Sequence, residues 1–229
     1  MSAISTSSKM MSVVIGLGGV RLSRWAGFDS VAMVELMTPR LLLRRPTQGD
    51  AADSLIMLQD PEVARWNPAP AVVDVETARA WCARGADWSD GTHATWHAVD
   101  RSSLRLVANC SIFAIDREEA TAKIGYRVGP WQRRRGIGSE VVQIVTEWAF
   151  DELGLSRIQL EHAVANIASC GVAFNAGFVL EGVLPSASRD GLGERHDNHV
   201  HGRLPADPVP VTARTDRGAR IADSAEESG

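Results

Sequence analysis

Cysteine is scarce in this chain of 229 residues, which contains only three. Cys82, Cys110 and Cys170 are odd in number, lie far apart and form no C-x-x-C pair. This pattern indicates neither a disulfide framework nor a zinc knuckle. We therefore expect a reducing, cytoplasmic location.

Long hydrophobic runs and an excess of positive charge are also missing. No apolar run approaches the roughly 20 residues that a membrane span requires. The run "MMSVVIGLGGV" (10–20) is followed by Arg21 and Arg24 and has no A-x-A cleavage site, so it is not typical of a signal peptide. A net charge of −4 argues against a general nucleic-acid binder and suits a cationic acceptor. We expect no membrane association and no specific nucleic-acid partner.

The composition is that of a folded domain, with 45% hydrophobic and 23% charged residues. Residues 1–36 show no sustained periodicity and are expected to be an N-terminal extension, disordered or not native to the protein. Met33 and Met37 stand next to the first convincing strand, so translation could start near Met33 as well as at Met1. We expect one domain over residues 38–204. Residues 205–229, rich first in proline and then in small and charged residues, are expected to be a disordered tail.

Periodicity divides the domain into helices and strands. Thr47 and Asp50 have the spacing of a capping box, which predicts a helix start, and Gly154 is expected to end the main helix. Helices are predicted over 50–58, 74–88, from about 137 to 153 and over 169–176, and strands over 40–46, 95–100, 104–115, 122–128, 157–164, 178–184 and 196–204. This order predicts an α/β (α+β) fold with a mixed sheet.

The stretch "WQRRRGIGSE" (131–140) places three arginines and two glycines between a strand and a helix. A helix start directs free backbone N–H groups at one point, where the helix dipole favours negative charge. Gly136 and Gly138 would let a phosphate approach the backbone, and Arg133, Arg134 and Arg135 would add charge. The alternative is a solvated basic turn before a core helix. A P-loop is not indicated, because no Gly-Lys-Ser/Thr follows.

Four segments in order carry a family resemblance: "TPRLLLRRPTQGDA" (38–51), "IGYRVGPWQRRRGIGSE" (124–140), "NIAS" (166–169) and "AGFVLEGVL" (176–184). The pattern R-x-x-G-x-G at Arg133, Gly136 and Gly138 resembles the acetyl-CoA loop of the GNAT superfamily of N-acetyltransferases. The set resembles the RimJ/RimL-like branch, which acetylates ribosomal-protein N-termini, over residues 38–204. The resemblance implies a single GNAT-type domain whose mostly antiparallel sheet is splayed at the cofactor site and flanked by helices.

The same resemblance implies a set of roles for binding acetyl-CoA. Strands 124–128 and 157–164 would splay around the pantetheine arm, Asn166 would hydrogen-bond that arm, and Ser169 would lie near the thioester sulfur as general acid. The alternative is that Asn166 or Ser169 caps the short helix. The residues implied to bind the cofactor are Val128, Arg133, Arg134, Arg135, Gly136, Ile137, Gly138, Ser139 and Asn166.

The general base is the point at which the chain departs from the family. RimL-like enzymes tend to carry a glutamate seven residues after Glu181, and this chain has Ser188 there. The candidates that remain are Glu161, His162, His196 and Glu181, of which Glu161 is placed with Ser169 as a catalytic residue.

His196, His199 and His201 form an H-x-x-H-x-H pattern that could suggest a metal site. On a strand, His199 and His201 would share a face and His196 would lie nearer the opposite one. No matching acidic or cysteine cluster is visible in the sequence, so we expect no metal.

The reaction implied is direct attack of an amine on a thioester, and a protein or peptide N-terminal α-amine, with a pKa near 8, demands little of a base. One alternative acceptor is a small amine such as an aminoglycoside, a polyamine or an amino-acid-derived antibiotic. The other alternative is a catalytically silent acyl-CoA-binding regulator. The sequence leaves the acceptor and the choice between monomer and homodimer open.

Overall fold

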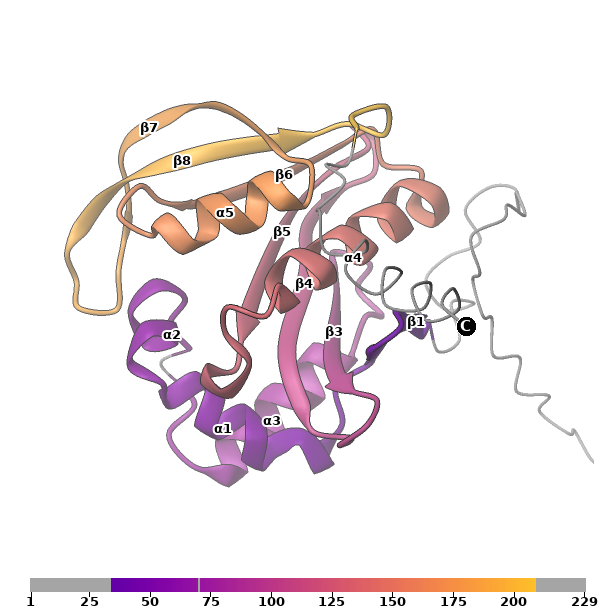
Figure 1. Ribbon diagram of the computed structural model, residues 1–229, viewed down its shortest axis with the longest axis vertical. Helices are drawn as coiled ribbons and strands as arrows, with labels where there is room; N and C mark the ends of the chain where they lie inside the picture. Colours follow the sequence, from indigo (N-terminus) through magenta and orange to yellow (C-terminus); the bar gives the residue numbers. More distant parts are fainter. Residues whose placement is uncertain (1–33, 70, 209–229) are drawn as a thin grey trace, which may run out of the picture.

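The computed structural model describes residues 34–69 and 71–208 (Figure 1), and the predictions for residues 1–33 and 209–229 lie outside it. The strands are β1 (Leu36–Met37), β2 (Leu41–Arg44), β3 (His93–Asp100), β4 (Leu106–Asp116), β5 (Thr121–Val128), β6 (Arg157–Ala163), β7 (Val179–Arg189) and β8 (Arg195–Arg203). The helices are α1 (Ala51–Gln59), α2 (Pro61–Trp66), α3 (Val75–Ala86), α4 (Ile137–Leu153) and α5 (Ile167–Asn175), with short 3-10 turns at Gln48–Asp50 and Pro130–Gln132.

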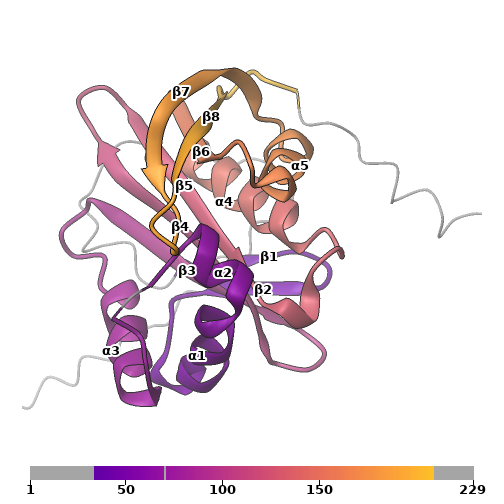
Figure 2. The same ribbon diagram turned by 90° about the vertical axis from the view of Figure 1, so that its left-hand side faces the viewer.

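One sheet of eight strands runs through the described residues in the order β1-β2-β3-β4-β5-β6-β8-β7. Every neighbouring pair is antiparallel except β5 and β6, which are parallel and joined by the α4 crossover. Figure 2 shows α4 and α5 on one side of the sheet and α1, α2 and α3 on the other. The predicted mixed, mostly antiparallel α/β fold is confirmed.

The parallel pair β5 and β6 is joined over a short distance. Residues 121–123 pair with residues 157–159, and no pairing follows beyond Lys123 and Gln159. β5 stays paired with β4 as far as Val128, and β6 stays paired with β8 as far as Ala163. Each strand therefore follows its outer neighbour and the two diverge, as the predicted splay requires.

The main core lies between the sheet and α4. One apolar stripe of α4 is buried against the sheet, at Val141, Val145, Trp148 and Ala149. Trp148 meets Trp96 edge to face at a centroid distance of 4.8 Å. Gly154 ends α4 in the left-handed conformation (φ 61°), as predicted.

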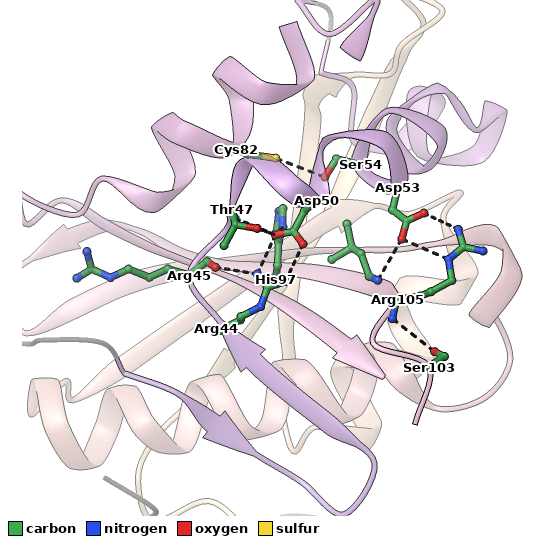
Figure 3. Close-up of polar contacts among 11 residues, drawn as sticks. Arg44, Arg45, Thr47, Asp50, Asp53, Ser54, Cys82, His97, Ser103 and Arg105 are labelled. Carbon is green, nitrogen blue, oxygen red and sulfur yellow. Dashed lines mark hydrogen bonds and ion pairs between the residues drawn. The ribbon is translucent and has the colours of Figure 1, made fainter. Parts of the chain in front are cut away.

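A buried ionic cluster joins the sheet to the α1 and α3 side (Figure 3). The Asp50 carboxylate accepts hydrogen bonds from Arg44 at 2.7 and 2.8 Å and from the Thr47 N–H at 2.8 Å. His97 Nδ1 lies 3.0 Å from the same carboxylate. Burial raises the pKa of Asp50, but the bonds from Arg44 and His97 outweigh it and hold that pKa well below its usual range. The predicted Thr47–Asp50 helix start is confirmed, and Asp50 also holds the sheet to the helices.

Three elements differ from the sequence-based expectations. Leu36, the last residue of the predicted extension, and Met37, which precedes the predicted domain, form β1 and pair with β2. β7 continues to Arg189, five residues beyond the predicted strand end at Leu184. α2 was not predicted, because six residues are too few for a helical period to emerge. Its signal was local: Asp60 caps the N-terminus, accepting from the N–H groups of Glu62 and Val63, and Pro61 is the first helical residue.

Replacing Asp50 by asparagine should lower the free energy of unfolding by about 3 kcal/mol, because Arg44 would keep a largely desolvated charge without its partner. Urea denaturation near neutral pH measures this loss. Because the pKa of Asp50 lies below its unfolded value, its contribution is present above about pH 4 and is lost as the pH falls.

Asp53→Asn is the matched control, because Asp53 lies in the first turn of the same helix and its ion pair with Arg105 is more exposed than the Arg44–Asp50 pair. That variant should lose less than about 1 kcal/mol. Equal losses in the two variants would show that Asp50 is an ordinary surface carboxylate.

Candidate active site

A cleft of about 1250 Å³ opens where β5 and β6 diverge. The turn before α4, the start of α5 and the helix α2 complete its walls. The predicted site residues that line it are Val128, Arg133, Arg134, Gly136, Ile137, Gly138, Ser139, Glu161, Asn166 and Ser169. Arg135 is the exception: its side chain is exposed and donates to Gln132 Oε1 at 3.3 Å.

The backbone of β5 offers polar groups to this cleft. Gly129 N–H donates to the carbonyl of Val107 at 2.9 Å. In an antiparallel pair the N–H and C=O groups of successive residues point to opposite sides, so every second residue of β5 is bonded to β4. The N–H and C=O groups of Val128 and Tyr126 consequently point away from β4, toward the gap. Asn67 Nδ2 donates to the Tyr126 carbonyl at 3.1 Å. The gap therefore provides the free strand edge on which an extended ligand can pair.

The turn before α4 has the geometry of an anion site. Arg134 (φ 59°) and Gly136 (φ 75°) adopt left-handed conformations and turn the chain into the helix. The N-cap is Gly136, which has no side chain to accept the N–H groups of the first turn. These N–H groups and the positive end of the α4 dipole meet at the cleft wall. This arrangement can bind phosphate oxygens.

Packing leaves little room for a side chain at Gly138. A Cβ at this position would lie 3.0 Å from Val172 Cγ2 and 3.2 Å from Tyr126 Cε2. The first turn of α4 therefore packs directly on α5 and β5.

Among the arginines of the turn, Arg133 forms an ion pair with Asp60, the N-cap of α2. It thereby ties the turn to α2.

Ser169 and Tyr126 form a hydrogen bond across the gap. The Ser169 hydroxyl, on α5, lies 3.0 Å from the Tyr126 hydroxyl, on β5. Burial raises the pKa of Tyr126 to about 12, so its hydroxyl stays protonated at neutral pH. Asn166 caps α5, and its Oδ1 accepts from the Ser169 N–H at 3.4 Å. The capping interpretation thus holds for Asn166, while the Ser169 side chain is directed at Tyr126.

The four candidate bases have different surroundings. Glu161 accepts from Lys123 at 2.6 Å and from Gln159 at 3.0 Å. Glu181 pairs with Arg157, and it is not among the residues that line the cleft.

The two histidine candidates are also engaged. His196 Nε2 lies 3.0 Å from Asp190. His162 lines the cleft but is buried, which lowers its pKa, and its Nδ1 donates to the Ala163 carbonyl at 2.8 Å. Ser188, at the family's glutamate position, donates to Asn198 at 2.7 Å. Each candidate therefore already has a partner.

Among the cleft residues that the sequence did not single out as site residues are Tyr126, Glu62, Asn67 and Arg127. Tyr126 is the only tyrosine of the chain and lies on the strand that leads toward the glycine turn, a signal that could have identified it. Glu62 and Asn67 belong to α2 and the residue after it, so missing that helix meant missing them. Trp66 of α2 also lines the cleft, and its Nε1–H donates to Glu62 at 3.2 Å.

The predicted alternation on the last strand holds in the structure. His199 and His201 lie on one face of β8, close to His162 of β6. His196 instead bonds Asp190 in the β7–β8 hairpin. Burial, followed by the neighbouring His162 and His199, lowers the pKa of His201 to about 4, so it is neutral at physiological pH.

A diverging parallel pair, a glycine turn at a helix start and a hydroxyl pair across the gap together define an N-acetyltransferase of the GNAT type. The chain matches the family described as "Acetyltransferase (GNAT) domain" over residues 40–179 and belongs to that family. Its acyl donor is acetyl-CoA, and the protein is an acetyl-CoA-dependent N-acetyltransferase.

Relatives and solved structures agree with this assignment. The uncharacterized N-acetyltransferase YoaA of Bacillus subtilis is 31% identical over 150 residues, which are 65% of this chain and 85% of YoaA. The ribosomal-protein-S5-alanine acetyltransferase of Vibrio fischeri superposes with a TM-score of 0.68 at 20% identity, covering 77% of this chain and all of the other. The microcin C7 self-immunity acetyltransferase MccE, solved with acetyl-CoA and AMP, gives 0.65 at 20% identity, over 73% and 93%.

Within residues 34–69 and 71–208, no helix combines the length and the hydrophobicity needed to cross a membrane.

Proposed function

We propose that the cleft binds acetyl-CoA with its pyrophosphate at the first turn of α4 and its pantetheine arm between β5 and β6. The acetyl group is then transferred to the α-amine of a protein or peptide N-terminus. The observation that carries this proposal is the loss of pairing between β5 and β6 directly beside a helix start without a side-chain cap. The pairing edge for the arm and the anion site for the phosphates lie in one cleft.

Acetyl-CoA supplies an activated thioester, and the side chains and backbone of this chain act on the groups around it. The Val128 N–H, directed into the gap, donates to the carbonyl oxygen as negative charge develops there. Tyr126 donates to the Ser169 oxygen, which leaves the Ser169 hydroxyl proton for the departing sulfur. Asn166 keeps Ser169 in place by capping the helix that carries it.

The proposed acceptor follows from the partners and the burial of the four candidate bases. Glu161, Glu181 and His196 are each engaged by a cation or a carboxylate partner, and His162 is buried. An α-amine with a pKa near 8 is partly neutral at pH 7 and demands little of such a base, whereas a lysine amine near 10.4 demands much more. Glu62 and Glu161 line the cleft as carboxylates that can attract an ammonium group. The comparison with a ribosomal-protein acetyltransferase supports the same acceptor.

A small amine is the second candidate, and one contact favours it. The β7–β8 hairpin closes on α2: Gly191 N–H donates to the Arg65 carbonyl at 2.7 Å and the Arg65 side chain bonds Asp190 at 3.1 Å. This contact joins α2, which lines the cleft, to the hairpin and could narrow the entrance for a protein chain.

Ser139→Glu should test the pyrophosphate site without unfolding the protein. A carboxylate in the first turn stabilises a helix, so the melting temperature should stay the same or rise slightly. Acetyl-CoA affinity measured by calorimetry should fall by about tenfold or more, because like charges ~5 Å apart repel by about 3 kcal/mol at an effective dielectric of ~20. Ser139→Ala keeps the backbone N–H groups and should bind nearly as wild type does. Unchanged affinity in Ser139→Glu would place the pyrophosphate elsewhere.

Ser169→Ala should lower kcat by roughly tenfold while leaving acetyl-CoA affinity nearly unchanged, because it removes only the donor to the sulfur. Tyr126→Phe should lower kcat by a smaller factor, since Tyr126 acts through Ser169. Both variants should remain folded, because Asn166 rather than Ser169 caps α5. If both variants only lower the melting temperature and leave kcat unchanged, the hydroxyl pair is structural.

Release of free coenzyme A thiol with a panel of acceptors should identify the acceptor class. Peptides with a free N-terminus should react, and the rate should rise with pH toward the pKa of the α-amine near 8. The same peptides with a blocked N-terminus and a free lysine should react far more slowly. Faster turnover of polyamines or aminoglycosides would establish the small-amine function. Equal rates with free and blocked N-termini would contradict the proposed acceptor.

A further inference from the structure

Helix α5 lies over β6 and β8 (Figure 1). Four side chains of the types that bind metal ions come together between these elements. They are His162 of β6, Cys170 of α5, and His199 and His201 of β8. Each offers one donor atom, and these atoms all lie within 4.8 Å of one another. His162 Nε2 is 3.2 Å from His201 Nε2, and Cys170 Sγ is 3.1 Å from His199 Nδ1.

The strand register brings the three histidines together. His162 and His199 are direct partners across the β6–β8 ladder, and His201 follows two residues later on the same face. The rings of His162 and His201 stack with centroids 5.1 Å apart. Cys170 then approaches from the helix above. The group therefore rests on β6 and β8, which are paired along this whole segment.

The hydrogen-bond pattern of His162 suits a metal ligand. Its Nδ1 lies 2.8 Å from the Ala163 carbonyl and must donate to it, so its Nε2 carries the lone pair. A second-sphere bond of this kind, from the far ring nitrogen to a carbonyl, is the usual partner of a metal-bound histidine. His201 is only 4% exposed, and among the described residues its Nδ1 is buried without a hydrogen-bond partner. The nearly buried rings of His162 and His201 therefore lie against each other, and the hydrogen-bonding capacity of their ring nitrogens is not fully used by the described residues.

We propose that His162, Cys170, His199 and His201 bind one divalent zinc ion in tetrahedral geometry. Zinc with bonds of about 2.1 Å to nitrogen and 2.3 Å to sulfur needs donor atoms roughly 3.4 to 3.6 Å apart. The two pairs at 3.1 and 3.2 Å nearly meet this requirement, and the widest separation has to contract by about 1 Å. One thiolate and three neutral imidazoles form a donor set that zinc accepts.

Such an ion would fasten α5 to the sheet. Cys170 directly follows Ser169, so a bond from its sulfur to an ion on β6 and β8 fixes the helix segment that carries the Ser169 hydroxyl. His162 also lines the acetyl-CoA cleft, which gives the ion a path of entry. The sequence predicted no metal because only the three histidines of residues 196–201 were visible as a motif. His162 and Cys170 join them only in the folded chain.

The site can be tested on the full chain after treatment with a chelator, using Co²⁺ as the spectroscopic probe and Zn²⁺ as the competitor. One equivalent of Co²⁺ should produce thiolate-to-cobalt charge-transfer absorption together with the visible bands of tetrahedral cobalt, and Zn²⁺ should abolish both. Zn²⁺ alone should raise the melting temperature by several degrees and slow alkylation of Cys170. Failure of Zn²⁺ to change either the melting temperature or the alkylation rate would leave only a thiol–imidazole pair and overturn the proposal.

Matched variants separate this site from other cysteines and histidines. Cys170→Ser should lose the charge-transfer absorption and weaken Zn²⁺ binding by at least tenfold, and His199→Gln should weaken it similarly. Cys82→Ser and His93→Gln, which lie outside the cluster, should behave as wild type. Circular dichroism verifies that each variant is folded. Full cobalt absorption in folded Cys170→Ser, or equal loss in Cys82→Ser, would overturn the assignment.

Discussion

The short pairing between β5 and β6 is the constraint on which the rest of the site depends. Two parallel strands joined by a crossover helix can pair along their whole length, yet here only residues 121–123 and 157–159 do so. Beyond them each strand is held by an antiparallel ladder on its outer side, to β4 and to β8. These antiparallel ladders hold each strand through the backbone groups that face outward. The N–H and C=O groups that face the gap have no strand partner there, and they stay exposed to the cleft. The glycine turn then starts α4 at the same cleft.

Side chains cross the gap that the backbone leaves open. On the side of the sheet that faces α4 and α5, the Tyr126 and Ser169 hydroxyls meet. Between the strands themselves, Lys123 of β5 bonds Glu161 of β6 at 2.6 Å. Lys123 is the last paired residue of β5, so its bond to Glu161 lies where the strands begin to part. The gap is therefore crossed by a charged pair at its closed end and by a hydroxyl pair farther along.

Much of this fold could be predicted from local patterns, because helices α1, α3 and α4 and the hairpin strands β3 to β5 have periods long enough to read. The glycine turn before α4 could be predicted too, since Gly136, Gly138 and the arginines are close together in sequence. What could not be predicted depends on partners far apart along the chain: Tyr126 and Ser169 are 43 residues apart, His162 and His201 are 39, and Cys170 and His199 are 29. The side chain of each looks ordinary by itself. The pairing register of β6 against β8 and the position of α5 are what bring these side chains into contact.

Helix α5 joins features that would otherwise be independent. Its Val172 packs against Gly138 in the first turn of α4, its Ser169 bonds Tyr126, and its Cys170 lies beside His199. A displacement of α5 would therefore disturb the glycine turn before α4, the Tyr126–Ser169 hydroxyl pair and the histidine cluster together. Coupling between binding sites is reciprocal: a ligand that binds better when α5 is in place must, when bound, stabilise α5 by the same free energy. Acetyl-CoA seated on α4 and α5, and any ion bound beneath α5, would consequently strengthen each other's binding without sharing a contact.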